Sequence, residues 1–244
     1  MMRYCKEEIF QILTDFYNFQ ATFDIKVDEE FEFTYQTSLN EWIVVCDLTG
    51  PKQLSRYYHG LFHLKRDVQE LESMFLNNEK TKIGDLCEYL ANHCERAKIS
   101  SIVLFKQACM SAGIFRALIS ELNLKGMRTD NIKPSSKIIP FFKKGGGELL
   151  EVVSKMAPGT LTNFEYEDNK TTTTGAQITL IGVLFVVLMT IFWKFSWWLL
   201  IPVILGIIIS KIGGWMKPKR FSVGYNTFRD LVSAIENNLP TELA

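Results

Sequence analysis

GAQITLIGVLFVVLMTIFW (residues 175–193), a single Lys194 and FSWWLLIPVILGIIISKI (residues 195–212) form two long apolar runs separated by one charge. As helices, runs of 18 or 19 residues reach ~27–29 Å, close to the ~30 Å thickness of a bilayer core. The pattern therefore predicts a two-helix transmembrane hairpin. Two alternatives stay open, namely a buried hairpin of a soluble core and a hairpin that dips into one leaflet.

Aromatic and basic residues flank both runs, as expected where membrane helices meet lipid headgroups. The predicted membrane-interface residues are Trp193, Lys194, Trp197, Trp198, Lys211, Trp215, Lys217, Lys219 and Arg220. Four of the basic residues lie at or after the end of the second run, whereas the turn contains only Lys194. The positive-inside rule then places both termini in the cytoplasm, and the charged start MMRYCKEEIF predicts no separate signal peptide.

The net charge of zero hides an asymmetry between the first half and the middle of the chain. Residues 1–95 carry a net charge of −8 and residues 96–172 a net charge of +5. Opposite charges favour packing of these two segments on each other, and the alternative is that the basic segment faces lipid headgroups. The basic residues form no dense stripe, so we expect no nucleic-acid partner. Five cysteines without C-x-x-C spacing indicate reduced, mostly buried thiols in a cytosolic domain.

Hydrophobic periodicity predicts a mainly α fold, with small helical cytoplasmic domains attached to the transmembrane hairpin. The expected divisions are an acidic helical domain at 1–95, a basic helical segment at 96–164, a polar linker at 165–174, the hairpin at 175–212 and a cytoplasmic tail with one amphipathic helix at 213–244. The expected helices are 3–19, 38–47, 53–63, 67–76, 81–94, 106–122, 135–142, 148–156 and 227–237.

Several local signals support these divisions. Ser38 with Glu41, and Thr227 with Asp230, have the spacing of a helix capping box. The alternation FEFTY at 31–35 predicts a short extended segment, and the glycines at 145–147 predict a flexible joint. IGDLCEYL (83–90) and FRDLVSAI (228–235) share the pattern apolar-x-Asp-Leu-x-x-x-apolar. They are either the closing helices of two similar small units or a chance similarity of two capped amphipathic helices.

Three segments resemble an acyl-carrier-protein-like helical domain. DLTGPKQLSRYYHGLF (47–62) is similar to the loop and helix that carry the Asp-Ser-Leu attachment motif, and KTKIGDLCEYL (80–90) to the closing Thr-x-Gly-Asp helix. IKPSSKI (132–138) is similar to an I-R-P-S-T segment of uncharacterised bacterial carrier-like proteins. The attachment position instead reads Pro51-Lys52-Gln53-Leu54, with Ser55 displaced. The resemblance therefore implies a helical scaffold that has lost its prosthetic group, in a membrane-anchored bacterial protein.

Candidate reactive residues are few. His59 and His63 are spaced i, i+4, so a helix would place both rings on one side, where they are weak candidates for a shared metal with Asp67. The alternative is two ordinary histidines on an amphipathic helix. Cys87 and Cys94, seven residues apart, have the spacing of a helix core, and a nucleophilic pair of cysteine and histidine stays open.

These observations favour a membrane-anchored, non-enzymatic adaptor or scaffold that presents a helical domain at the cytoplasmic surface of a bacterial inner membrane. Its expected partners are the lipid bilayer and another membrane or cytoplasmic protein, and we expect no cofactor. Two alternatives remain: a degenerate acyl-carrier-like protein of lipid or envelope metabolism, and a metal- or cysteine-dependent membrane-associated enzyme.

Overall fold

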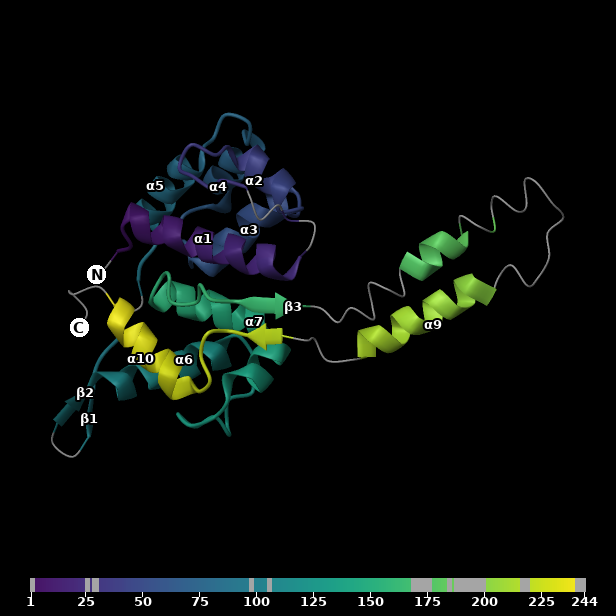
Figure 1. The fold of residues 1–244 in the computed structure, drawn as a ribbon. Helices are drawn as coiled ribbons and strands as arrows, with labels where there is room; N and C mark the ends of the chain where they lie inside the picture. Colours follow the sequence, from purple (N-terminus) through teal and green to yellow (C-terminus); the bar gives the residue numbers. More distant parts are fainter. Residues whose placement is uncertain are drawn as a thin grey trace. The chain divides into compact units, whose positions relative to one another are not determined.

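A computed structural model shows the chain to be mainly helical (Figure 1). It describes residues 3–24, 27, 31–96, 99–104, 107–167, 177–183, 186, 201–215 and 220–239. The chain divides into two units. We call Met1–Phe164 together with Ser222–Ala244 the helical domain, and Glu165–Phe221 the apolar unit.

The first half of the helical domain is built from short helices around one core. These are α1 (Lys6–Phe23), α2 (Leu39–Val45), α3 (Pro51–Leu61), α4 (Val68–Leu76) and α5 (Ile83–His93). Helix α1 packs against α5, and α3 packs against α4. The side chains that are fully buried in this core include Ile9, Ile12, Leu13, Leu39, Leu71, Phe75, Leu86 and Leu90.

Local sequence signals explain where two of these helices begin. The N–H of Glu41 donates to Ser38 Oγ at 3.1 Å, and the N–H of Ser38 donates to Glu41 Oε2 at 2.7 Å. This confirms the predicted capping box at the start of α2. Helix α3 begins at Pro51 directly after Gly50, where a proline loses no intrahelical hydrogen bond.

The predicted extended segment at 31–35 does not form a β-strand. Residues 31–34 form a loop that enters a turn at Tyr35. The rings of Phe33 and Tyr35 stack on Phe10, with centroids 5.5 and 4.2 Å away, and Phe33 also stacks on Tyr17. The alternation of apolar and polar residues therefore reflects aromatic packing on α1 and not pairing in a sheet.

The second half of the helical domain begins with a two-stranded hairpin and continues in helices. Its elements are β1 (Ile102–Leu104), β2 (Gln107–Cys109), α6 (Met110–Leu124), α7 (Ile138–Met156) and, after the apolar unit, α10 (Phe228–Asn238). Helix α10 packs against α6 and α7. Helix α6 begins later than predicted because residues 107–109 pair with residues 102–104. It ends as predicted at Gly126, whose φ of 79° suits glycine.

The predicted joint at the glycines 145–147 coincides with a kink at Gly145, where two helical segments meet within α7. Gly145 has the non-helical angles φ −163° and ψ 52°, and the helix continues on both sides of it. A Cβ atom at Gly145 would lie 2.2 Å from Met127 Sδ. The kink therefore lies where a neighbouring side chain leaves no room for a larger residue.

The acidic and basic segments pack together within the helical domain, as predicted, because α1 lies against α7. Tyr4 donates to the carbonyl of Lys155 at 2.9 Å, and the N–H of Gly159 donates to Asp15 Oδ2 at 2.9 Å. Arg96 is paired with Glu8 and also donates to a carbonyl of α7. Main-chain hydrogen bonds therefore contribute to this junction beside the opposite charges.

The apolar unit contains a helical segment at 177–183, α9 (Ile201–Trp215), the strand β3 (Glu165–Glu167) and the first two residues of its partner strand β4 (Arg220–Ser222). A Cβ atom at Gly206 would lie 2.5 Å from Thr179 Oγ1, so α9 closely approaches the segment 177–183. Within the parts of the chain that the structure describes, no helix combines the length and the apolar character needed to cross a membrane. Much of the predicted hairpin, including 184–185 and 187–200, lies outside the described residues.

Candidate functional site

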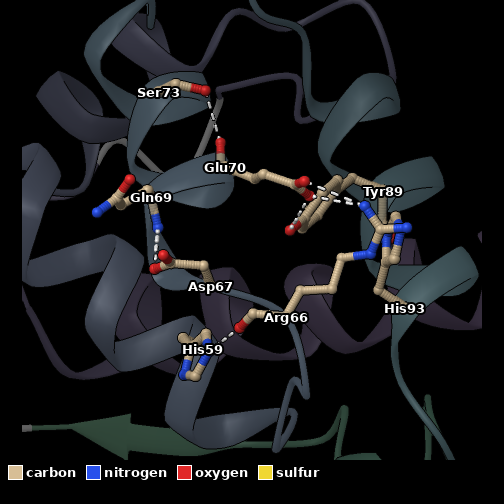
Figure 2. A network of polar contacts seen from close by, with 8 residues as sticks. All are labelled: His59, Arg66, Asp67, Gln69, Glu70, Ser73, Tyr89 and His93. Atoms are coloured by element: carbon tan, nitrogen blue, oxygen red, sulfur yellow. Dashed lines mark hydrogen bonds and ion pairs between the residues drawn. The ribbon is translucent and has the colours of Figure 1, made fainter.

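The two histidines that were candidates for a metal do not share a helix face. Helix α3 ends at Leu61, and His63 follows it with a φ of 48°. His59 Nε2 donates instead to the carbonyl of Arg66 at 2.7 Å (Figure 2). Asp67 caps α4 by accepting from the N–H of Gln69. The prediction of one continuous helix through both histidines is therefore wrong, and no metal-binding group of three His, Cys, Asp or Glu occurs among the described residues.

A surface network joins α4 to α5 next to these residues (Figure 2). Arg66 Nη1 lies 3.1 and 3.2 Å from the two carboxylate oxygens of Glu70, and the Tyr89 hydroxyl donates to Glu70 Oε2 at 3.3 Å. His93 Nδ1 donates to the carbonyl of Tyr89 at 2.7 Å. Burial and the neighbouring Glu70 raise the pKa of Tyr89. Each of these polar groups is already hydrogen-bonded within the network. We therefore interpret the network as a structural link between α4 and α5.

The cysteines of the core are poorly suited to nucleophilic chemistry. Cys46, Cys87 and Cys94 are buried. Burial raises the pKa of Cys46 to about 11 and the pKa of Cys87 and Cys94 to about 12. A thiol with such a pKa carries almost no thiolate near neutral pH. Burial of these three free thiols agrees with the prediction of mostly buried cysteines, whereas Cys5 is exposed.

A cleft of about 130 Å³ with both apolar and ionisable lining residues lies between the two halves of the helical domain, and the sequence did not predict it. Tyr4, His63, Glu121 and Lys155 are among the residues that line it. Burial, with a smaller effect of Lys125, lowers the pKa of Lys155, and burial followed by the nearby Lys155 lowers the pKa of His63. Lys155 Nζ donates to the carbonyl of Leu61 at 2.8 Å. Its amine is therefore held by the main chain, in the same cleft as His63 and Glu121.

A larger pocket of about 360 Å³ lies between α1, α3 and α7. We call it the aromatic pocket, because five of its lining residues are aromatic: Phe16, Phe19, Phe23, Tyr57 and Tyr58. Leu54 and Leu150, both buried, contribute to its apolar lining. The spacing of the three phenylalanines along α1 was a visible signal, but the sequence does not show which helices face it.

The predicted membrane-interface residues are mostly outside the described residues. This applies to Trp193, Lys194, Trp197, Trp198, Lys217 and Lys219. Lys211 is exposed on α9, Trp215 is the last residue of α9, and Arg220 is the first residue of β4.

Comparisons with known proteins add no relative: no family model, curated protein or solved structure matches the chain.

Proposed function

We propose that this chain is a membrane-anchored, non-enzymatic adaptor that presents its helical domain at the cytoplasmic face of a bacterial inner membrane. Its partners would be the lipid bilayer and a second protein at that surface. Tethering confines the helical domain to the membrane surface and raises its effective concentration toward partners there.

The apolar surface of the apolar unit carries this proposal. Large aliphatic side chains on both of its described helical segments are between 45% and 73% exposed. They are Leu180, Ile181, Val183, Ile201, Ile204, Leu205, Ile207 and Ile208. Soluble monomers rarely expose large contiguous apolar patches, and full burial of one such side chain contributes about 1.5–3 kcal/mol. A lipid bilayer would remove this surface from water, and the apolar sequence continues from these segments into residues 184–200.

Membrane flotation after alkaline carbonate extraction tests the anchor. We expect the full chain to float with membranes. The variant Leu205→Arg/Ile208→Arg should be released, because an arginine near the centre of a membrane helix opposes insertion by roughly 2.5–3.5 kcal/mol. The matched control Val44→Arg/Leu76→Arg changes two exposed aliphatic residues of the helical domain. A soluble full chain, or equal flotation of both double variants, would contradict the proposal.

The adaptor role requires a partner of the helical domain. A chain cut before Gly175 is a poor control, because it removes α10, which packs against α6 and α7. Since β3 and β4 are neighbours in one sheet, a Gly/Ser linker that replaces residues 168–219 keeps α10 in the chain. Crosslinking and capture should give the same partner with the full chain and with the linker variant. A partner captured only by the full chain would assign binding to the apolar unit instead.

We further propose that the helical domain is a carrier-like scaffold without a prosthetic-group arm, and the start of α3 supports this. The attachment position contains Lys52 and Gln53. Ser55 is fully buried and its hydroxyl donates to the carbonyl of Lys52 at 3.0 Å, so it is not presented to a modifying enzyme.

Incubation with coenzyme A and a phosphopantetheinyl transferase, followed by intact-mass measurement, tests this second proposal. The natural chain should keep its mass. The variant Lys52→Asp/Gln53→Ser gives the order Asp-Ser-Leu at positions 52–54, with Leu54 as its leucine, and should gain one phosphopantetheine group. Modification of the natural chain, or no modification of the double variant, would count against a carrier-like scaffold.

A further inference from the structure

The aromatic pocket has the size and lining of a small-molecule site. Its volume of about 360 Å³ lies within the range of roughly 300–1,000 Å³ that is typical of ligand pockets. Tyr58, Leu54 and Leu150 are at most 5% exposed, so the pocket has a buried, rigid side. Phe16, Phe19 and Phe23 belong to α1, whereas Leu54, Tyr57 and Tyr58 belong to α3.

The charged side chains among the described lining residues are both acidic. Asp24, at the end of α1, and Glu151 on α7 are acidic, and none of the described residues that line the pocket is basic. Glu151 Oε1 accepts from the Tyr57 hydroxyl at 2.6 Å, while its other oxygen accepts from Lys125, which is not a lining residue. These contacts fix the Glu151 carboxylate at the pocket wall, where its ion pair with Lys125 compensates part of its charge. Together with Asp24, the three side chains carry a net charge of −1. Carboxylates next to aromatic rings favour a cation, because both ring faces and carboxylates attract positive charge.

One glycine of α7 faces this space. A Cβ atom at Gly147 would meet no atom within 4 Å, whereas Cβ atoms at Gly145 and Gly146 would meet Met127 and Phe142 at 2.2 and 2.9 Å. Glycine is unfavourable inside a helix, and packing does not require one at position 147. Gly147 lines the aromatic pocket, and its missing side chain leaves the pocket open.

From these observations we infer that the aromatic pocket binds an organic cation with an apolar body, of the aryl- or alkylammonium class. The ammonium group lies next to the carboxylates of Asp24 and Glu151, and the apolar body packs against the phenylalanines of α1 and the tyrosines of α3. This site is separate from the anchoring of the chain, since all its lining residues belong to the helical domain.

Three probes of nearly equal shape test the charge preference, namely tryptamine, tryptophol and indole-3-acetate. Each is titrated calorimetrically into the full chain in a non-ionic detergent, with a detergent blank. We expect tryptamine to bind about tenfold more tightly than tryptophol, and indole-3-acetate to bind more weakly than tryptophol. Equal binding of all three probes, tighter binding of the anion, or no binding of tryptamine would overturn the inference.

Two glycine variants locate the binding site. Gly147→Leu fills the aromatic pocket and should abolish tryptamine binding. Gly60→Leu is the matched control, because Gly60 is also an exposed helical glycine with no atom within 4 Å of a Cβ, and it does not line the pocket. Equal binding by these two variants would overturn the assignment to this pocket.

Gly147→Leu could fail to fold, and a thermal unfolding curve would reveal this. A third variant tests the site independently of Gly147→Leu. Asp24→Asn removes one charge without changing the shape of the side chain. It should weaken tryptamine binding about five- to tenfold and leave tryptophol binding unchanged. An equal effect of Asp24→Asn on both probes would contradict the proposed position of the ammonium group.

Discussion

Ser38 and Lys82 are joined by an antiparallel backbone bridge, and a second bridge of the same kind joins Lys137 to Thr227 in the second half of the helical domain. In both bridges, the first residue of each helix donates its N–H to the carbonyl that precedes the partner residue. The four hydrogen bonds are Leu39 to Thr81 at 2.9 Å, Ile83 to Thr37 at 2.8 Å, Ile138 to Asn226 at 3.1 Å and Phe228 to Ser136 at 3.0 Å.

The helices around the two bridges also correspond. Helix α2 has 7 residues and α3 has 11, and the kink at Gly145 divides α7 into residues 138–144 and 146–156, which have the same lengths. In each half the first long helix packs on the last one, α1 on α5 and α6 on α10. The similar sequences at 83–90 and 228–235 are thus closing helices of two similar units. The apolar unit interrupts the second of them, between α7 and α10.

Two capping boxes should stabilise the two halves separately. Thr227 Oγ1 accepts from the N–H of Asp230 as Ser38 Oγ accepts from the N–H of Glu41. We expect Ser38→Ala and Thr227→Ala each to lower the free energy of unfolding by about 1 kcal/mol, measured by chemical denaturation. Because the two caps are in different halves, the double variant should show the sum. Gln53→Ala, an exposed change on α3, is the control, and a loss as large as that of the caps would contradict this assignment.

The features that were predicted correctly from the sequence depend on residues that are close to each other in the chain. The capping residues Ser38 and Thr227 and the helix break at Gly50-Pro51 are read from a few neighbouring residues, and the structure confirms them. His63 was placed wrongly because nothing in its local pattern shows that α3 ends at Leu61. The aromatic pocket was missed because α1, α3 and α7 are distant in the chain, so its lining depends on tertiary packing.

Substitution of neighbouring glycines in α7 should have opposite effects on stability. Gly147→Ala should raise the free energy of unfolding by about 0.5–1 kcal/mol, because alanine is favoured in helices and its Cβ meets open space. Gly145→Ala should lower it by about 1–3 kcal/mol, since its Cβ would overlap Met127. Denaturation curves of the two variants check both signs. Gly60→Ala should match Gly147→Ala, and stabilisation by Gly145→Ala would show that the kink is not constrained by packing.

The buried ion pair at the junction of the two segments should matter far more than an exposed one. The Arg96 side chain is 4% exposed, pairs with Glu8 and donates to the carbonyl of Met156 at 2.6 Å. We expect Arg96→Met to lower the free energy of unfolding by about 3 kcal/mol, because the carbonyl of Met156 loses this donor and Glu8, whose side chain is 19% exposed, loses its positive partner. The exposed Lys65 is paired with Glu95 at 2.7 Å, and Lys65→Met should cost at most about 1 kcal/mol. Similar losses for the two variants would place the Arg96 pair in contact with solvent.

Because three thiols are buried, we expect the fold to lose stability at alkaline pH. In the unfolded chain Cys46, Cys87 and Cys94 ionise near their usual pKa of 9.0, whereas burial raises the pKa in the fold to about 11 or 12. Their contribution is therefore fully present below pH 9 and is lost as the pH rises toward 11 to 12. The free energy of unfolding should fall more steeply above about pH 9 for the natural chain than for Cys46→Ala/Cys87→Ala/Cys94→Ala. Parallel pH profiles would show that the thiols are accessible to water in the fold.

The exposed Cys5 can report on the orientation of the helical domain. With Cys109→Ser as background, the remaining cysteines other than Cys5 are buried. If both termini are cytoplasmic, a membrane-impermeant maleimide should label Cys5 in spheroplasts only after permeabilisation. The added variant Lys194→Cys, at the predicted turn, should be labelled in intact spheroplasts. Labelling of Cys5 in intact spheroplasts would show that the N-terminus lies on the outer side of the membrane, opposite to the proposed orientation. Labelling of neither residue before permeabilisation would favour a hairpin that enters one leaflet and returns, because such a hairpin exposes nothing on the far side of the membrane.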